Sequence, residues 1–263
     1  MTIREPDMSR TPPTAVRREL RGEVGFGCPV PECGVPYLTY HHFDPPWSVE
    51  HHHRPEGMIA LCRRHADLAD AGTWTDDQLR TFKSAASGTL AELFGRFEWM
   101  RHDVIALIGG NFYADTPRMV SYRDEPVIWY ERDEHSHVLL NVRMLTASGE
   151  PRAELRNNDW IVVGSPTDVE SPPGGRTLRV RYENGDDLMV AFWEAATLEA
   201  FRDRYKLPES DAYAELPFPL LVTEIQMTVA DGGIRFGPRT TEVGQAKITG
   251  FGVFRLRDGF VIT

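Results

Sequence analysis

The chain has 263 residues, 41% of them hydrophobic, and a formal net charge of -10. This length allows one or two domains, and no segment approaches the roughly 18 apolar residues that a membrane-spanning helix needs. The charge argues against a broad basic nucleic-acid-binding face: residues 1–108 carry 12 Lys and Arg against 15 Asp and Glu, and residues 109–263 carry 17 against 24.

The N-terminal residues are rich in Arg and Pro, and we expect residues 1–16 to form a flexible tail. Arg17, Arg18 and Arg21 follow, and Arg63 and Arg64 form a second basic pair. Each group either contacts phosphates or belongs to a solvated helix face, and the sequence leaves both interpretations open.

Residues 28–65 hold all three cysteines and six of the nine histidines. Cys28 and Cys33 form a C-x4-C pair in a turn rich in Pro and Gly, and Cys62 and His65 form a C-x2-H pair. The two pairs, with 28 residues between Cys33 and Cys62, supply the four ligands of a tetrahedral structural zinc site. The alternative is one disulfide and a free thiol, but the odd cysteine count and the lack of a signal-like N-terminus favour zinc in a reducing cytoplasm.

Five further histidines lie between the cysteine pairs. His41 and His42 are adjacent, and packing in a strand rarely needs two neighbouring imidazoles, so we expect them to carry chemistry. The run from His51 to His53 leads into the turn-like Pro55, and a solvated loop explains it as well as a function does.

This order of parts, followed by a helical-looking segment at residues 66–70, resembles the HNH endonuclease family. The resemblance covers residues 17–85, and its specific parts are the cysteine turn and the string HHFDPPW at residues 41–47. It implies a small zinc-stapled ββα-metal domain, in which a hairpin carries the His pair and a helix supplies another ligand to one catalytic ion, Mg²⁺ or Mn²⁺. By this resemblance His41 ligates the ion and His42 is the general base, which Asp44 or a backbone carbonyl orients.

Two positions depart from the family pattern. Ala66 stands where the family commonly has its third signature residue, a histidine, and the middle asparagine has only Arg54 and Gly57 as candidates. Three interpretations of Ala66 remain open. It is an inactivating change, natural or engineered, or Asp70 replaces the lost ligand from the same helix face. The third interpretation is that the domain binds nucleic acid without cutting it.

After this domain, Thr75 and Gln78 form a capping box that begins a helix. Its apolar stripe comprises Leu79, Phe82, Ala86, Leu90, Leu93 and Phe94, with a weak point at Ser87 and Gly88. We interpret this helix as the linker that completes an HNH-like domain at residues 17–108.

Residues 109–263 have strand-like periodicity. Alternating apolar residues flank Asn184 and Gly185, which is a strong hairpin signal, and further strands are predicted at residues 127–130, 138–142 and 220–229. A short helix is predicted at residues 196–205, and His135 and His137 lie in a polar turn. The predicted fold is therefore α+β, with a β-rich C-terminal domain that folds by itself.

We expect a metal-dependent endonuclease that hydrolyses phosphodiester bonds in nucleic acid, DNA foremost, as a regulated bacterial defence effector. The β-rich domain is then a module for sensing, docking or assembly, and the partner is a short Argonaute-like protein, another sensor or a second copy of the chain. The alternative is a non-catalytic module that binds nucleic acid or protein through a structural zinc finger.

Overall fold

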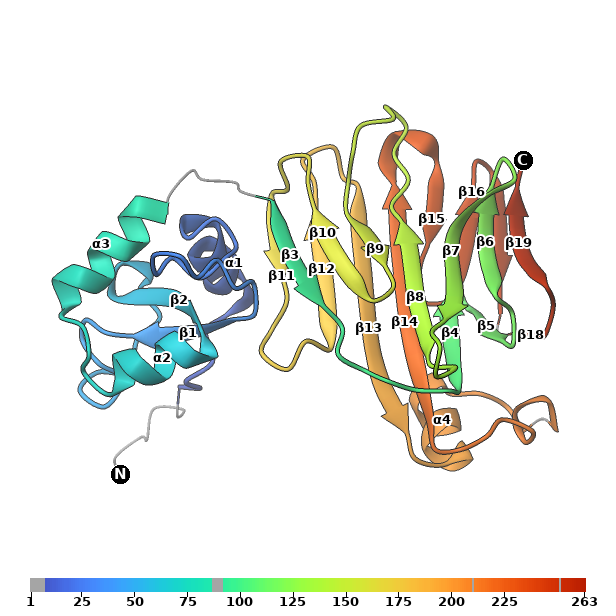
Figure 1. Ribbon diagram of the computed structural model, residues 1–263, viewed down its shortest axis with the longest axis horizontal. Helices are drawn as coiled ribbons and strands as arrows, with labels where there is room; N and C mark the ends of the chain where they lie inside the picture. The colour runs from blue at the N-terminus through green and yellow to red at the C-terminus, as the bar shows by residue number, and fades with distance from the viewer. Residues whose placement is uncertain (1–7, 87–91, 210, 251) are drawn as a thin grey trace, which may run out of the picture. The chain divides into compact units, whose positions relative to one another are not determined.

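The computed structural model describes residues 8–86, 92–209, 211–250 and 252–263 (Figure 1). Two compact units divide the chain: the first contains Met1–Leu93 and Asp168–Gly174, and the second contains Phe94–Thr167 and Gly175–Thr263. The fold is α+β with a β-rich C-terminal part, as predicted. Within the described segments, no helix has the length and apolar character of a membrane span.

The first unit packs three helices around a two-stranded hairpin. Its strands β1 and β2 are antiparallel, with His41 opposite Ile59 and His42 opposite Met58. All five residues of β2 are buried, because helices pack against the hairpin and enclose this apolar run. The elements are α1 (Thr14–Glu23), β1 (Leu38–His42), η1 (Pro55–Gly57), β2 (Met58–Cys62), α2 (Arg63–Asp70), α3 (Asp76–Ala86) and, from the later segment, β11 (Asp168–Glu170).

The helix boundaries correct two predictions. Helix α1 begins at Thr14, so the tail that was expected at residues 1–16 is too long. Residues 1–7 of this tail lie outside the described part of the chain. The capping box of α3 is confirmed, because Gln78 N donates to Thr75 Oγ1 at 3.3 Å and Thr75 N donates to Gln78 Oε1 at 2.9 Å. The predicted helical stripe ends earlier, since Leu93 already lies in strand β3, and Ser87, Gly88 and Leu90 lie outside the described residues.

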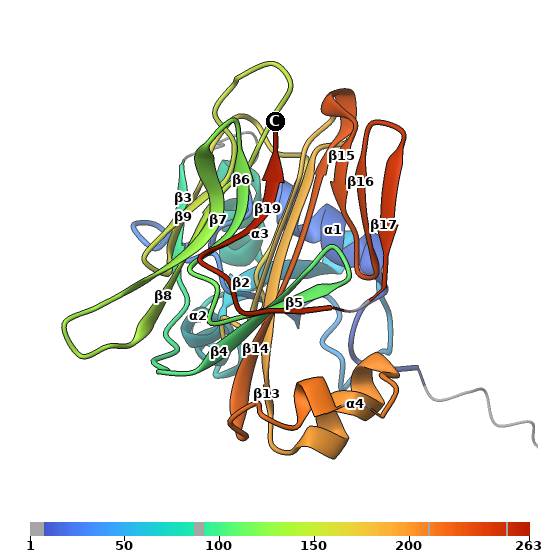
Figure 2. The ribbon, with the colours of Figure 1, turned by 90° about the vertical axis from the view of Figure 1, so that its right-hand side faces the viewer.

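The second unit contains two β-sheets that face each other (Figures 1 and 2). One sheet has the order β19-β6-β7-β8-β9-β10-β3. Its strands are β3 (Leu93–Arg96), β6 (Arg118–Tyr122), β7 (Glu125–Arg132), β8 (Val138–Arg143), β9 (Glu154–Arg156), β10 (Asp159–Val162) and β19 (Asp258–Ile262).

The other sheet of this unit includes the order β12-β13-β14-β15-β16-β17. These strands are β12 (Thr177–Arg181), β13 (Asp187–Ala195), β14 (Leu220–Val229), β15 (Ile234–Phe236), β16 (Thr240–Val243) and β17 (Ala246–Thr249); β4 (Val104–Ile108), β5 (Asn111–Ala114) and β18 (Val253–Phe254) join them. The hairpin predicted at Asn184 and Gly185 is confirmed, since β12 and β13 pair antiparallel around it. Helix α4 (Leu198–Tyr205) buries Phe201 against Phe112, and two 3-10 turns complete the unit, η2 (Asp211–Tyr213) and η3 (Ala230–Gly232).

The second unit begins before residue 109, where the sequence analysis set the boundary. Strand β4 pairs parallel with β14, Val104 lying opposite Leu221 and Ile108 opposite Ile225. Ile105 and Ile108 are almost fully buried, at 1% and 0% exposure. Local periodicity does not reveal this pairing, because β14 lies more than a hundred residues further along the chain.

We therefore expect a fragment of residues 94–263 to fold and a fragment of residues 109–263 to aggregate. The shorter fragment loses β4, which removes buried apolar side chains and leaves the pairing edge of β14 open. Soluble expression and circular dichroism of the two fragments are the measurement. A soluble, cooperatively melting 109–263 fragment would show that β4 is dispensable.

Candidate functional site

The cysteine turn between α1 and β1 is closed by backbone hydrogen bonds. Cys33 N donates to Val30 O at 3.0 Å, and Gly34 N donates to Cys28 O at 3.2 Å. Gly34 has a φ of 60°, a conformation that glycine adopts without steric cost. This closure turns the two cysteines toward the start of α2, where Cys62 is the N-cap residue and His65 lies in the first turn.

The four predicted zinc ligands lie together. His65 Nδ1 is 3.2 Å from Cys28 Sγ and 3.4 Å from Cys62 Sγ. Cys33 Sγ is 3.8 Å from Cys62 Sγ, and all four ligand atoms lie within 4.8 Å of one another. A tetrahedral zinc ion with bonds of about 2.3 Å to sulfur and about 2.0 Å to nitrogen requires S···S separations of about 3.8 Å and S···N separations of about 3.5 Å. The cluster could therefore hold a structural metal such as zinc.

Burial shapes the protonation of this cluster. It raises the pKa of the Cys28 and Cys62 thiols and lowers the pKa of His65. Without a cation the thiols therefore stay protonated and the imidazole stays neutral at pH 7. A bound divalent ion has to displace thiol protons, so its affinity falls as the pH falls.

His41 and Asp70 meet across the hairpin and helix α2. His41 Nδ1 lies 3.0 Å from Asp70 Oδ1, and the His41 residue is only 8% exposed. Burial lowers the pKa of His41, although the Asp70 carboxylate opposes the shift. The 3.0 Å separation is that of a hydrogen bond from His41 to Asp70, and it also equals the distance between adjacent ligands of an octahedral ion with bonds of about 2.1 Å.

His42 is enclosed by aromatic rings and is 3% exposed. Its ring centroid lies 4.7 Å from that of Trp47 and 5.3 Å from that of His52. Burial lowers the pKa of His42 to about 4, and the His52 imidazole adds to the shift. Neither ring nitrogen has a hydrogen-bond partner among the described residues. Because buried polar atoms are usually paired, these nitrogens mark a place for a polar group that the protein does not itself supply.

A cavity of about 360 Å³ joins these groups. It is lined by Arg10, His41, His42, Phe43, Pro46, Trp47, Ser48, Ala69, Asp70, Gly72, Trp74, Asp76 and Leu79. Arg10 lies 4.0 Å from Asp70 and adds a positive charge that the sequence analysis assigned only to a flexible tail. An imidazole with free nitrogens, an imidazole–carboxylate pair and a cation can together bind a phosphate ester and accept a proton from water.

The remaining residues to which the HNH resemblance assigned a role, or a missing one, make structural contacts instead. Asp44 pairs with Arg80, so it does not orient His42. Arg54 pairs with Glu50 on the surface, and Gly57 leaves no room for a side chain because an added Cβ would lie 1.9 Å from Asp44 O. Ala66 is buried, with 6% exposure, and belongs to the apolar core of this unit.

Arg21 is part of a buried network rather than a phosphate contact. Its Nε and Nη2 donate to Asp168 Oδ1 at 3.0 and 2.8 Å, and its Nη2 also donates to Asp168 Oδ2 at 2.9 Å. Its Nη1 donates to the hydroxyl of Tyr40 at 2.8 Å. Arg21 and Asp168 are 1% and 0% exposed. Asp168 could not be predicted as the partner, because no local sequence pattern links it to a residue 147 positions earlier in the chain.

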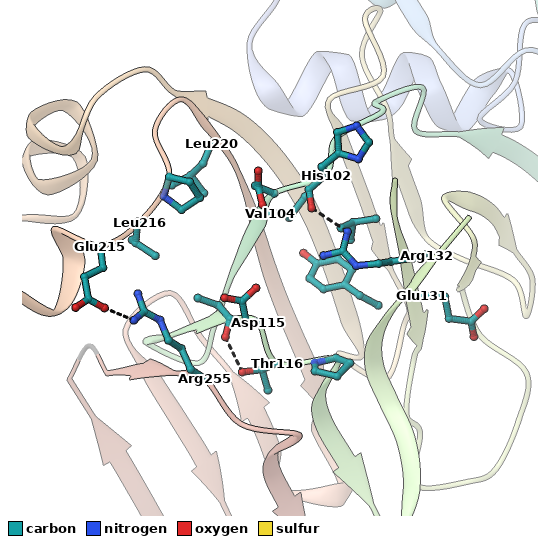
Figure 3. Close-up of a pocket in the computed structure, with 16 residues that line it drawn as sticks. His102, Val104, Asp115, Thr116, Glu131, Arg132, Glu215, Leu216, Leu220 and Arg255 are labelled. Atoms are coloured by element: carbon teal, nitrogen blue, oxygen red, sulfur yellow. Dashed lines mark hydrogen bonds and ion pairs between the residues drawn. The ribbon is translucent and has the colours of Figure 1, made fainter. Parts of the chain in front are cut away.

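A separate cavity of about 550 Å³ lies within the second unit (Figure 3). Arg132 lies on its wall and donates through Nη1 to His102 O at 3.0 Å and to Ser136 O at 2.7 Å, and Arg255 pairs with Glu215. Next to it, His137 Nδ1 lies 3.0 Å from Asp133 Oδ2 in the predicted polar turn. The charged groups on this wall have both signs and do not single out a class of ligand.

We compared the chain with models of protein families, with curated proteins and with solved structures. None of the three comparisons finds a match.

Proposed function

We propose that the first unit is an HNH-type nuclease site that hydrolyses phosphodiester bonds in nucleic acid, DNA foremost. With zinc bound, the Cys28, Cys33, Cys62 and His65 cluster would fasten the cysteine turn to the start of helix α2, and His41 and Asp70 would hold Mg²⁺ or Mn²⁺. The single observation that carries this proposal is the 3.0 Å contact between His41 Nδ1 and Asp70 Oδ1, in the same cavity as His42, whose ring nitrogens have no hydrogen-bond partner among the described residues.

His42 is suited to accept a proton from water. Its lowered pKa keeps it neutral at pH 7, and its free nitrogens offer a lone pair to a water molecule in the cavity. An imidazole with a pKa of about 4 is a weak base, but an anionic phosphodiester beside it would raise that pKa. The divalent ion supplies Lewis acidity, which stabilises charge on the phosphate and on the leaving oxygen.

Asp70 supplies the metal ligand that a histidine at position 66 supplies in the HNH family. The two positions are four residues apart on α2, so their side chains share one helix face. A carboxylate is a hard oxygen ligand that Mg²⁺ and Mn²⁺ accept readily. The site therefore keeps two protein ligands, and we infer that it is weakened by Ala66 rather than abolished.

A specific observation also favours a second candidate, a binding module without catalysis. Ala66 is packed into the apolar core, and a base as weak as His42 gives slow proton transfer. In that case the zinc cluster is purely structural, and the cavity binds nucleic acid or protein without cutting.

For the β-rich unit we propose a docking or assembly role in a cytoplasmic defence system. Its strand-rich fold carries no second set of clustered metal ligands in the described residues, so its contribution is binding. The chain's charge of -10 means that tight nucleic-acid binding needs a partner with positive charge, such as a short Argonaute-like sensor, or assembly of several copies.

Ala66→His is expected to raise the rate of plasmid nicking in Mg²⁺ or Mn²⁺ by about 10- to 100-fold. Residues that support a metal site typically change metal affinity or activity by this factor. The added imidazole would join His41 and Asp70 as a third ligand. Adding His42→Ala should remove the gain, because nothing would then accept the proton from water.

The controls separate the two candidates. Asp70→Asn should reduce nicking in the present chain, while Asp67→Asn, on an exposed position of the same helix, should not. Zinc content and melting temperature verify that each variant is folded. If Ala66→His is folded and binds Mn²⁺ but no version of the chain nicks DNA with or without a partner, the binding module is the better description.

A further inference from the structure

Trp47 is not explained by the apolar core. It lies in the loop that joins β1 to η1 and is half-buried, yet in the described part of the first unit it does not pack against the core cluster. Trp74 lines the same cavity and does pack there, with its ring centroid 5.4 Å from that of Phe82. Core packing therefore accounts for Trp74 and leaves Trp47 without a structural reason.

Trp47 is instead held by histidines. His51 stacks on it with a centroid distance of 4.4 Å and an angle of 10° between the rings, and His53 lies at 5.5 Å and 22°. His51 and His53 do not line the cavity, whereas Trp47 and His42 do. The histidine run that has no role in the zinc site therefore packs on Trp47, a residue that lines the cavity.

The cavity also contains unpaired polar atoms. Both nitrogens of His42, which lines the cavity, lack a hydrogen-bond partner among the described residues. An aromatic wall beside such atoms is complementary to a ligand that has both an aromatic face and polar edges. The volume of about 360 Å³ lies near the lower end of small-molecule pockets, so it admits one nucleotide and not a stacked duplex.

We propose that this cavity takes the nucleobase next to the scissile phosphate, stacked on Trp47, so that the site acts on single-stranded or locally unpaired nucleic acid. This inference rests on the proposed nuclease function and names its substrate class. A base in a duplex is already stacked on both faces, whereas an unpaired base can stack on a protein ring. Stacking also compensates for the low positive charge of this unit, since its described residues, 8–86, 92–93 and 168–174, carry 9 Lys and Arg against 13 Asp and Glu.

The test is binding of a fluorescent single-stranded oligonucleotide to the full-length chain in buffer without magnesium or manganese. We expect tighter binding of the single strand than of a duplex of the same sequence. Trp47→Leu should weaken binding of the single strand about tenfold and leave binding of the duplex unchanged, while Trp47→Phe, which keeps a ring, should remain within about threefold of the parent. Val49→Ala is the matched control, because Val49 is in the same loop and 75% exposed.

A second measurement uses the unmodified protein, so its result does not depend on whether the Trp47→Leu variant folds. An oligonucleotide with abasic sites keeps its phosphates but loses its bases, so it should bind about tenfold more weakly. Equal binding of abasic and intact strands would overturn the base-stacking inference, and so would unchanged binding by a folded Trp47→Leu variant.

The nuclease assay distinguishes the two proposals. If Ala66→His cuts duplex and single strands equally and Trp47→Leu does not alter this, the inference about Trp47 fails while the nuclease function stands. If single-strand binding depends on Trp47 but no version cuts, the base site stands and the nuclease function fails.

Discussion

Loss of zinc is expected to unfold the first unit and to leave the second unit folded. The cluster joins the turn at Cys28 and Cys33 to the start of α2, and both Cys28 and Cys62 are part of the buried core of this small unit. Structural zinc binding is worth about 10–16 kcal/mol at pH 7 in zinc-finger peptides, which exceeds the usual stability of a small domain. Cys33→Ser should therefore abolish folding of this unit at 25 °C.

Metal analysis and hydrogen exchange measure this effect. We expect one zinc per chain in the parent protein and less than one in Cys33→Ser, together with rapid exchange of the β1 and β2 amides. Val35→Ser serves as the control, because Val35 is partly exposed in the same turn and supplies no ligand. A Cys33→Ser variant with full zinc content and unchanged exchange would exclude Cys33 as a ligand.

Asp168→Ala is expected to destabilise the first unit by about 3–5 kcal/mol, the usual loss when one partner of a buried ion pair is removed. Asp168 receives three hydrogen bonds from Arg21, and both side chains are shielded from water. Burial alone would lower the pKa of Arg21, but Tyr40 and Asp168 raise it, so the guanidinium stays charged. In Asp168→Ala it would lose its three hydrogen bonds to a carboxylate and keep the longer 3.5 Å contact of Nη1 with Glu170 Oε1.

Two variants test the physical cause. Arg21→Met combined with Asp168→Leu removes both charges and should recover much of the lost stability, because well-packed apolar residues can replace a buried ion pair. Asp67→Ala breaks the exposed Arg63–Asp67 pair and should cost less than about 1 kcal/mol. The free energy of unfolding of each variant is measured by urea unfolding, with hydrogen exchange of the β1 and β2 amides as the signal from the first unit. Equal small losses for Asp168→Ala and Asp67→Ala would mean that the buried pair contributes little.

The Asp168 contact also affects which fragments of the first unit can fold. A fragment of residues 1–108 contains the zinc ligands and the His41–Asp70 pair, but it lacks Asp168–Gly174, which belongs to the same compact unit. Such a fragment leaves Arg21 buried without its partner. Activity and binding assays therefore require the full chain.

Local sequence was enough for the zinc cluster and for many of the elements. Cysteine is rare in this chain, so two short pairs with metal-ligand spacing identified Cys28, Cys33, Cys62 and His65 before their geometry was known. The capping box at Thr75 and the hairpin at Asn184 are equally local, because turn and cap residues act on backbone groups a few positions away.

Tertiary structure alone decided the contacts between distant segments. It placed β4 beside β14, buried Arg21 against Asp168, and set Trp47 on the cavity wall with His51 behind it. Apolar periodicity indicates that a residue will be buried, but it does not indicate which distant residue it will meet, since many pairings satisfy the same pattern. The sequence by itself therefore determined the cluster of residues that could hold a metal and the local elements, whereas packing over long chain separations determined which charged and aromatic side chains surround the candidate site.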